Sequence, residues 1–336
     1  MRNSLTFHLL RFLTAAALQL CMATAFAVVD GELDPNTVES TWAGVGSITV
    51  GEGTYSGTLI APNYVLTAAH VVGNRRPEEI TFNLNYGGDL THRIKAEAIY
   101  LRPGFLGAVG FKPGGEKDLA VIRLAEPAPA GVPIYELYED DLPQGSIVTF
   151  VGYGGSGMGA LGATEKGQPQ SKRWGSNVAD CFAFTPGPEN CDMIDLLGNG
   201  PKAIYLFDFD PPSRPGQKPN GRLPFNEATL AGGDSGSPAF VYVQGQWRVA
   251  AVNTFVTRDG PNGRTSVFGT AGGGVLVSGE NGHWIRSIIA PAEHGLAPQS
   301  LPSGHLPEPQ TWFLLGFGLL NVAVAVWRQV RSFTNP

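Results

Sequence analysis

The feature that most constrains the fold is a punctuated pattern of short apolar runs, each ended by glycine, proline or another turn residue. Gly (45) and Pro (26) together make up more than a fifth of the 336 residues. A chain interrupted so often is unsuited to a helical bundle and is typical of many short strands joined by turns. The middle of the chain is therefore expected to be all-β.

The runs that predict strands fall into two groups, one before and one after a Pro/Ala-rich stretch at 125–132. Two such groups indicate two closed antiparallel barrels. Segment 155–228 is rich in Gly and Pro and predicts surface loops, and a helix is expected at 283–289. The strands are expected at Val45–Val50, Tyr55–Ile60, Ile80–Leu84, Leu119–Leu124, Ser146–Val151, Ala239–Val243, Trp247–Val252 and Gly274–Val277.

Residues 1–27 predict a secretory signal peptide. Arg2 and Arg11 supply a weakly basic start, an apolar stretch runs from Phe12 to Met22, and Ala25-Phe26-Ala27 fits an A-x-A cleavage site. The apolar stretch is short for a membrane span, which is the competing interpretation. Export would place the mature chain outside the cytoplasm.

The far end carries a second apolar segment, at 312–327, which follows Pro307-Glu308-Pro309 and precedes Arg328 and Arg331. Tryptophan at each edge and basic residues beyond it are typical of a transmembrane helix. The three parts together resemble the PEP-CTERM sorting tail of Gram-negative bacteria. That resemblance implies transient anchoring in the inner membrane, processing by an exosortase, and delivery to the cell surface. An ordinary C-terminal anchor is the alternative.

Three cysteines are present, and Cys21 would leave with the signal peptide. In an exported protein, Cys181 and Cys191 could close a short loop as a disulfide. Two cysteines alone do not distinguish that bridge from two free thiols, and the bridge is the favoured interpretation.

Composition excludes several function classes. The formal net charge is −6 with no basic run behind it, which argues against a nucleic-acid partner. Gly152–Gly157 matches GxGxxG after a strand, but more glycine follows where a dinucleotide site needs a helix. No His, Cys and carboxylate cluster has metal-ligand spacing. Neither a cofactor nor a metal is expected.

Three short motifs carry the chemistry. Gly232-Gly-Asp-Ser235-Gly-Ser-Pro238 places a serine among glycines, Thr67-Ala-Ala-His70 follows an apolar strand, and Lys117-Asp118 opens another. A serine hydroxyl needs a base such as imidazole to become a nucleophile, and the imidazole needs a carboxylate to hold its tautomer.

These motifs resemble the active-site motifs of the chymotrypsin/trypsin family, in that family's chain order of His, Asp, Ser. Supporting stretches at 57–60, 151–154 and 284–285 extend the resemblance over nearly all of 28–289. It implies Ser235 as nucleophile, His70 as base and Asp118 as orienter, with the backbone N–H groups of Gly233 and Ser235 as the oxyanion hole. It also implies two six-stranded antiparallel barrels, at about 28–135 and 145–290, with a short C-terminal helix. A linker at 291–306 and the sorting segment at 307–332, with its transmembrane helix, would follow.

The same family is activated when a new amino terminus pairs with the Asp before the nucleophile. Cleavage after Ala27 would leave Val28-Val-Asp-Gly31, which looks like that activated terminus. The expectation is that the Val28 α-amino group pairs with Asp234 without a separate propeptide.

Some positions depart from the family pattern. Tyr55 and Val71 stand where most relatives have a cysteine pair beside the histidine. Thr229, six residues before Ser235, argues against strong selection for Lys or Arg. Asn253-Thr254-Phe255 replaces the usual Ser-Trp-Gly edge of the specificity pocket, and Phe255 is expected to narrow its entrance.

The sequence therefore predicts an exported serine endopeptidase that acts on peptides, with signal peptidase, an exosortase-type enzyme and the membrane as further partners. The alternative is a catalytically idle relative that binds a partner at the cell surface. Retention of all three triad residues speaks against it. An esterase is disfavoured because the motif around Ser235 is not a GxSxG nucleophile elbow.

Overall fold

The computed structural model describes residues 28–110, 114–183, 203–212, 223, 227–258, 260 and 263–290. The chain divides into two units, Met1–Ser300 and Leu301–Pro336, and every described residue belongs to the first. The signal peptide, Cys191 and the sorting tail with Pro307-Glu308-Pro309 lie outside the described residues, so those expectations remain predictions. No helix among the described residues is both long and apolar enough to cross a bilayer.

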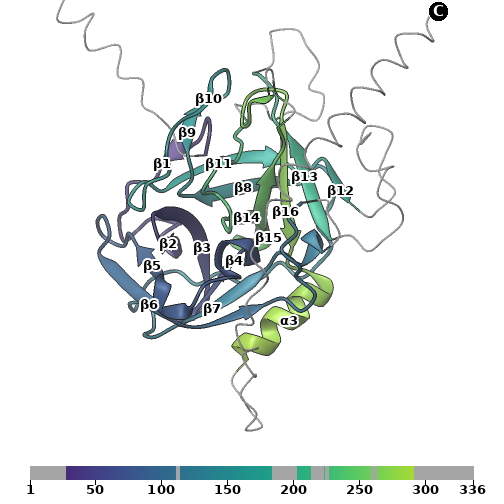
Figure 1. Cartoon of the computed structure of the whole chain (residues 1–336). Helices are drawn as coiled ribbons and strands as arrows, with labels where there is room; N and C mark the ends of the chain where they lie inside the picture. Colours follow the sequence, from purple (N-terminus) through teal and green to yellow (C-terminus); the bar gives the residue numbers. More distant parts are fainter. Residues whose placement is uncertain are drawn as a thin grey trace, which may run out of the picture. The chain divides into compact units, whose positions relative to one another are not determined.

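The first half is a closed antiparallel barrel of six strands in the order β2-β3-β4-β7-β6-β5 (Figure 1). Ile48, Leu59 and Phe82 are among its fully buried side chains. Burying each such side chain contributes about 1.5–3 kcal/mol to folding. The strands are β2 (Val45–Val50), β3 (Gly53–Ala61), β4 (Tyr64–Thr67), β5 (Ile80–Leu84), β6 (His92–Leu101) and β7 (Ala120–Leu124).

The second half is an eight-stranded antiparallel sheet in the order β1-β11-β8-β14-β15-β16-β13-β12, with β9 and β10 as a separate hairpin (Figure 1). Its strands are β1 (Glu32–Leu33), β8 (Ile147–Gly152), β9 (Ser156–Met158), β10 (Gly162–Glu165), β11 (Arg173–Val178), β12 (Cys181–Ala183), β13 (Ile204–Asp208), β14 (Pro238–Val243), β15 (Gln246–Val256) and β16 (Ala271–Leu276).

Two expectations need revision in this half. The second closed barrel is not confirmed, because the hydrogen-bonded ladder of the described residues ends at β1 and β12. The prediction of surface loops throughout 155–228 is wrong, because five strands, β9 to β13, begin there. They are short, and β13 is buried on both faces over most of its length, so it lacks the alternation that marks a half-exposed strand.

Helices are few. α2 (Ala69–Val72) follows β4, and α3 (Gly279–Ile289) ends the described chain, four residues earlier at its start than expected. Two 3₁₀ helices are present at Pro77–Glu79 and Gly115–Lys117. α3 buries Ile285 and Ile288 in a core cluster that also contains barrel side chains.

Aromatic side chains join the two halves. Phe240 of β14 lies 5.2 Å from Trp42 and 4.7 Å from Tyr135, measured between ring centroids. Trp42 is also within 4.9 Å of Trp247. Such contacts exclude water and add about 0.5–1.5 kcal/mol per pair beyond burial. The halves therefore share one core.

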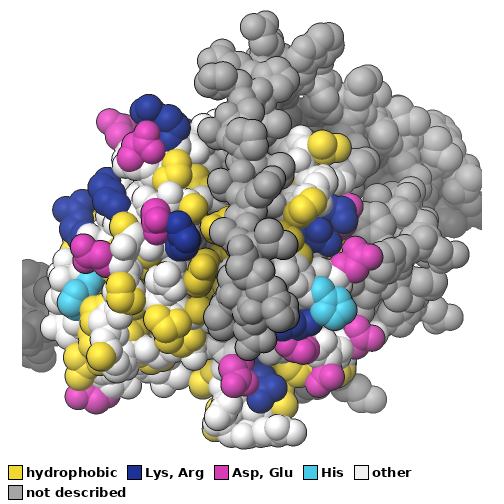
Figure 2. All heavy atoms as spheres, turned by 90° about the horizontal axis from the view of Figure 1, so that it is seen from below, with side chains coloured by type: hydrophobic (Ala, Val, Ile, Leu, Met, Phe, Trp, Pro, Cys, Tyr) yellow, Lys and Arg dark blue, Asp and Glu magenta, His cyan; other side chains and the backbone are white. Residues whose placement is uncertain are grey.

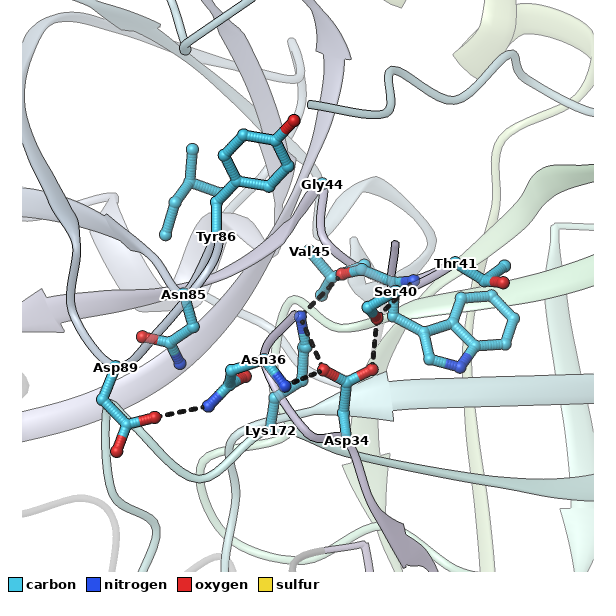
Figure 3. A network of polar contacts seen from close by, with 12 residues as sticks. Asp34, Asn36, Ser40, Thr41, Gly44, Val45, Asn85, Tyr86, Asp89 and Lys172 are labelled. Carbon is cyan, nitrogen blue, oxygen red and sulfur yellow. Dashed lines mark hydrogen bonds and ion pairs between the residues drawn. The ribbon is translucent and has the colours of Figure 1, made fainter. Parts of the chain in front are cut away.

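The segment before the barrel is held by buried polar groups, here called the N-terminal polar cluster and comprising Asp34, Asn36, Ser40 and Lys172 (Figure 3). The Lys172 ammonium lies 3.2 Å from Asp34 Oδ1 and donates to the Trp42 carbonyl at 3.0 Å. Asn36 N–H and the Ser40 hydroxyl also donate to Asp34. Lys172 is fully buried and Asp34 is 3% exposed, so neither charge has water as an alternative partner.

On the face seen in Figure 2, basic and acidic side chains are interspersed rather than gathered into a field of one sign. Some of the described charged residues form ion pairs, such as Arg123 with Glu97 at 2.7 Å.

Candidate active site

The barrel brings His70 and Asp118 together. Thr67 at the end of β4 pairs with Ala120 at the start of β7, so the residues just beyond these two ends lie side by side. His70 sits on α2, and Asp118 follows the 3₁₀ helix Gly115–Lys117. This placement follows from the antiparallel register of two neighbouring strands.

Asp118 contacts His70 through both of its carboxylate oxygens. Its Oδ2 lies 2.7 Å from His70 Nδ1, and its Oδ1 accepts the backbone N–H of His70 at 2.8 Å. The carboxylate is fully buried, whereas the imidazole is 24% exposed. Because an ionised carboxylate only accepts hydrogen bonds, Nδ1 carries the proton and Nε2 is left as a base.

Ser235 lies in the segment 232–237, here called the nucleophile loop, just before β14. Gly236 fixes this loop against the histidine segment: a Cβ there would lie 2.1 Å from Thr67 Oγ1 and 2.3 Å from the Ser56 carbonyl. Its φ of +85° also favours glycine. The close approach requires glycine and places the loop beside the residues that lead into His70. Ser235 itself is partly exposed.

The candidate oxyanion donors are oriented by the same loop. Gly155 N–H donates to the Gly232 carbonyl at 2.8 Å. In a trans peptide the C=O and N–H point in opposite directions, so the Gly233 N–H points away from Gly155. Within the described residues, neither the Gly233 N–H nor the Ser235 N–H donates to a protein acceptor. Both are available to a substrate oxyanion.

Asp234 is fully buried. Its two oxygens accept N–H groups from Gly154 at 2.8 Å and Ala231 at 2.9 Å. Burial raises the pKa of Asp234 to about 7, and these two hydrogen bonds oppose the rise. A Cβ on Gly152 or Gly154 would lie 2.2 or 2.5 Å from this carboxyl group. The glycines of the GxGxxG match therefore pack closely against the buried Asp234 carboxyl group.

The segment that begins at Val28 is inserted into the second half. Val28 and Val29 are fully buried. Val29 exchanges two backbone hydrogen bonds with Thr229, at 2.9 and 3.1 Å. Asp30 N–H donates to the Gly157 carbonyl at 3.1 Å. This pairing places the expected amino terminus, Val28, beside Thr229, which is the residue six before Ser235.

The four expected pocket residues behave differently from one another. Thr229 is fully buried and Thr254 is 4% exposed, and neither hydroxyl has a protein partner among the described residues. Phe255 packs near Gly273 and Gly110, where an added Cβ would lie 2.8 and 3.4 Å from its ring. Phe255 thus lies between the loop of Gly110 and β16, and a narrowed pocket entrance stays a prediction.

Asn253 supports the nucleophile loop rather than facing outward. It is fully buried, its Oδ1 accepts the Tyr205 hydroxyl, and its Nδ2 donates to Ser237 Oγ at 2.9 Å. Its backbone accepts the Gly236 N–H at 2.9 Å. Asn253 therefore has a supporting role behind the loop, and its place at the edge of the specificity pocket stays a prediction.

Two supporting residues, Ser56 and Tyr205, were missed by the sequence reasoning. Each lies on a strand, where a serine or a tyrosine gives no signal of a contact with a loop far along the chain. Cys181 is buried on β12, and its expected partner Cys191 lies outside the described residues, so the bridge stays a prediction. No cluster of three His, Cys, Asp or Glu suited to a metal ion is present in the described part of the chain.

Fold and site together define a protein with a closed β-barrel in its first half and a buried aspartate paired with a histidine whose segment lies beside a loop that carries a serine. A model of the trypsin-like peptidase domain matches residues 55–252, more than half of the chain and the span that holds His70, Asp118 and Ser235. The chain belongs to the family of trypsin-like peptidases, whose substrates are peptides. A comparison with curated proteins gives no significant match.

Proposed function

We propose that the protein is a serine endopeptidase that cleaves peptide bonds through an acyl-enzyme on Ser235. The observation that carries this proposal is the double contact of buried Asp118 with His70, in a trypsin-like peptidase domain whose nucleophile loop packs beside the histidine segment.

In the proposed reaction, His70 Nε2 takes the Ser235 hydroxyl proton as Oγ attacks the substrate carbonyl carbon. The negative charge that develops on the carbonyl oxygen is met by the N–H groups of Gly233 and Ser235, each such donor being worth about 10²–10³ in rate. His70 then gives the proton to the leaving amine as the C–N bond breaks. Water, deprotonated by the same imidazole, hydrolyses the ester and restores Ser235.

We assign Val28 and Asp234 to activation. The buried Asp234 carboxylate has two N–H donors but no cation among the described residues, and an α-ammonium at Val28 would supply one. Val28 has φ +48°, which is strained for a β-branched residue, and a cut between Ala27 and Val28 removes that torsion. The cut that signal peptidase makes during export would then also activate the chain.

The proposed location is the cell surface of a Gram-negative bacterium, reached after transient anchoring in the inner membrane through the tail at 307–332. The support is the order of Pro307-Glu308-Pro309, apolar segment and arginines in the sequence. Processing by an exosortase-type enzyme follows from the same proposal.

The test of the activity is digestion of a peptide library by the mature protein, with Ser235→Ala as the paired sample. We expect cleavage only with Ser235 present, and little preference for Lys or Arg before the cut because Thr229 is neutral. Cleavage that persists in Ser235→Ala would refute the assignment.

A further inference from the structure

Ser56, on β3 of the barrel, contacts the nucleophile loop with both its backbone and its side chain. Its backbone N–H donates to the Ser235 carbonyl at 3.1 Å. Its hydroxyl donates to the Gly233 carbonyl at 3.1 Å and accepts the Tyr153 N–H at 3.0 Å. The side chain is fully buried, so water does not compete for these bonds.

These bonds fix the peptide planes on both sides of Gly233. The Gly232 carbonyl is held by Gly155 N–H, and the Gly233 carbonyl is held by the Ser56 hydroxyl. Gly233 has φ +100°, and an added Cβ would lie 2.8 Å from the Thr54 carbonyl, so glycine is required there. The plane of the Gly233 carbonyl also carries the Asp234 N–H, which donates to the Ala231 carbonyl at 3.0 Å. The Ser56 hydroxyl is thus the side-chain contact among those that set the direction of the Gly233 N–H.

We propose that the Ser56 hydroxyl is a positioning group that aims the Gly233 N–H at the substrate oxyanion. This inference rests on the proposed peptidase function, and Ser56 touches neither substrate nor reacting atoms. An oxyanion donor is effective only when it is aimed at the oxyanion before charge develops, and small misplacements at such sites cost large factors in rate. Loss of the hydroxyl leaves the Gly233 carbonyl and the Tyr153 N–H without this partner.

The chain offers a matched control in Ser47, which faces Ser56 directly across the β2–β3 pair. Ser47 is likewise fully buried. Its hydroxyl donates to the Pro169 carbonyl at 3.1 Å and accepts from Asn83 Nδ2 at 3.2 Å. Ser56→Ala and Ser47→Ala therefore each remove a hydroxyl oxygen from a fully buried side chain, and each removes one donated and one accepted hydrogen bond. Only the first removes a contact with the nucleophile loop.

The experiment measures the rate of Ser235 phosphonylation by a fluorophosphonate as a function of probe concentration. We expect Ser56→Ala to lower the limiting rate about tenfold or more, with half-saturation little changed, because the hydroxyl acts on the transition state and not on probe binding. Ser47→Ala should react at about the rate of the unmodified protein, although both variants lose thermal stability. Equal limiting rates in the two variants would overturn the proposal.

A second readout does not depend on activity. Amide hydrogen exchange of the nucleophile loop is compared for Ser56→Ala and Ser47→Ala, each in a Ser235→Ala background. Faster exchange at 233–237 in the Ser56 variant alone supports the positioning contact, and identical exchange overturns it. Absence of Ser235-dependent labelling in the unmodified protein would instead refute the peptidase function, while exchange still decides whether Ser56 holds the loop.

Discussion

At the scale of single residues, the Asp118–His70 contact is the most sensitive part of the account. Asp118→Asn keeps a carbonyl oxygen for the His70 backbone N–H but offers a neutral amide to Nδ1, which favours the wrong imidazole tautomer. We predict a fall in kcat of about 10⁴ with the fold intact. Peptide hydrolysis and circular dichroism check this, with the exposed carboxylate variant Asp141→Asn as control. A decrease in kcat of less than tenfold would contradict the role assigned to Asp118.

A second prediction at this scale concerns Asp180, whose pKa is raised to about 7 by burial and by its acidic neighbours Asp208, Glu227 and Asp210. A carboxyl group with a raised folded-state pKa binds its proton more tightly in the native state. Its contribution to stability is therefore lost as pH rises from about 4 to about 7.

Asp180→Asn should accordingly leave the free energy of unfolding unchanged near pH 4 and raise it by about 1–2 kcal/mol at pH 8, after allowance for partial exposure. Urea unfolding across this range measures the difference. A variant less stable than the unmodified protein at pH 8 would show that the carboxylate is better satisfied than this account holds.

Sequence reasoning found the residues with chemical signatures and missed those that hold them. His70, Asp118 and Ser235 stand in recognisable motifs, and the structure brings the first two within hydrogen-bond distance. Ser56 and Tyr205 act through contacts with residues far away in the chain, which no local pattern encodes. The contacts that Asn253 makes behind the loop were missed for the same reason.

At the scale of elements, β1 and the N-terminal polar cluster attach the segment that begins at Val28 to β11. β1 pairs with β11 through only Glu32 and Leu33, so this short strand depends on its surroundings. The buried Asp34–Lys172 ion pair supplies the attachment just after it (Figure 3).

Lys172→Met should destabilise the protein by about 3–5 kcal/mol, because it leaves the Asp34 carboxylate buried without its cation. The double variant Lys172→Met with Asp34→Leu should recover much of this loss, since no charge is then buried alone. Urea unfolding of the two variants and the parent checks the prediction. A double variant less stable than Lys172→Met would contradict it.

The elements also show where strand prediction succeeds. β2 and β5 have the expected bounds, because each is a clear apolar run closed by turn residues. β6 alternates but is rich in charged residues, and β11 contains Arg173, Ser176 and Asn177. β13 is an apolar run as long as β5, but it lies within the segment whose Gly and Pro content predicts loops. Their pairing partners define them more than their own composition does.

At the scale of the whole molecule, the proposed cut between Ala27 and Val28 would link export to activity. Val29 is already paired with Thr229, which places the new amino terminus in the second half next to the segment that leads to the nucleophile loop. Asp234, with a pKa raised to about 7 by burial, has no cation among the described residues, and in the proposed activation the Val28 α-ammonium supplies one.

We predict that protein beginning at Val28 is at least about tenfold more active than protein carrying one extra glycine before it, because only the first presents an α-ammonium to Asp234. Both forms can be released from the same fusion by proteases that differ in cutting site, and initial rates of peptide hydrolysis compare them. Equal rates of hydrolysis would contradict the proposal that the export cut activates the protein.

Ser235 can be identified as the nucleophile by mass spectrometry of protein that begins at Val28, after reaction with a fluorophosphonate. We predict one covalent adduct per chain, located on Ser235, absent from Ser235→Ala and formed much more slowly in His70→Ala. Correctly folded and processed protein that carries no adduct, or carries it on another residue, would contradict the claim that Ser235 is the nucleophile.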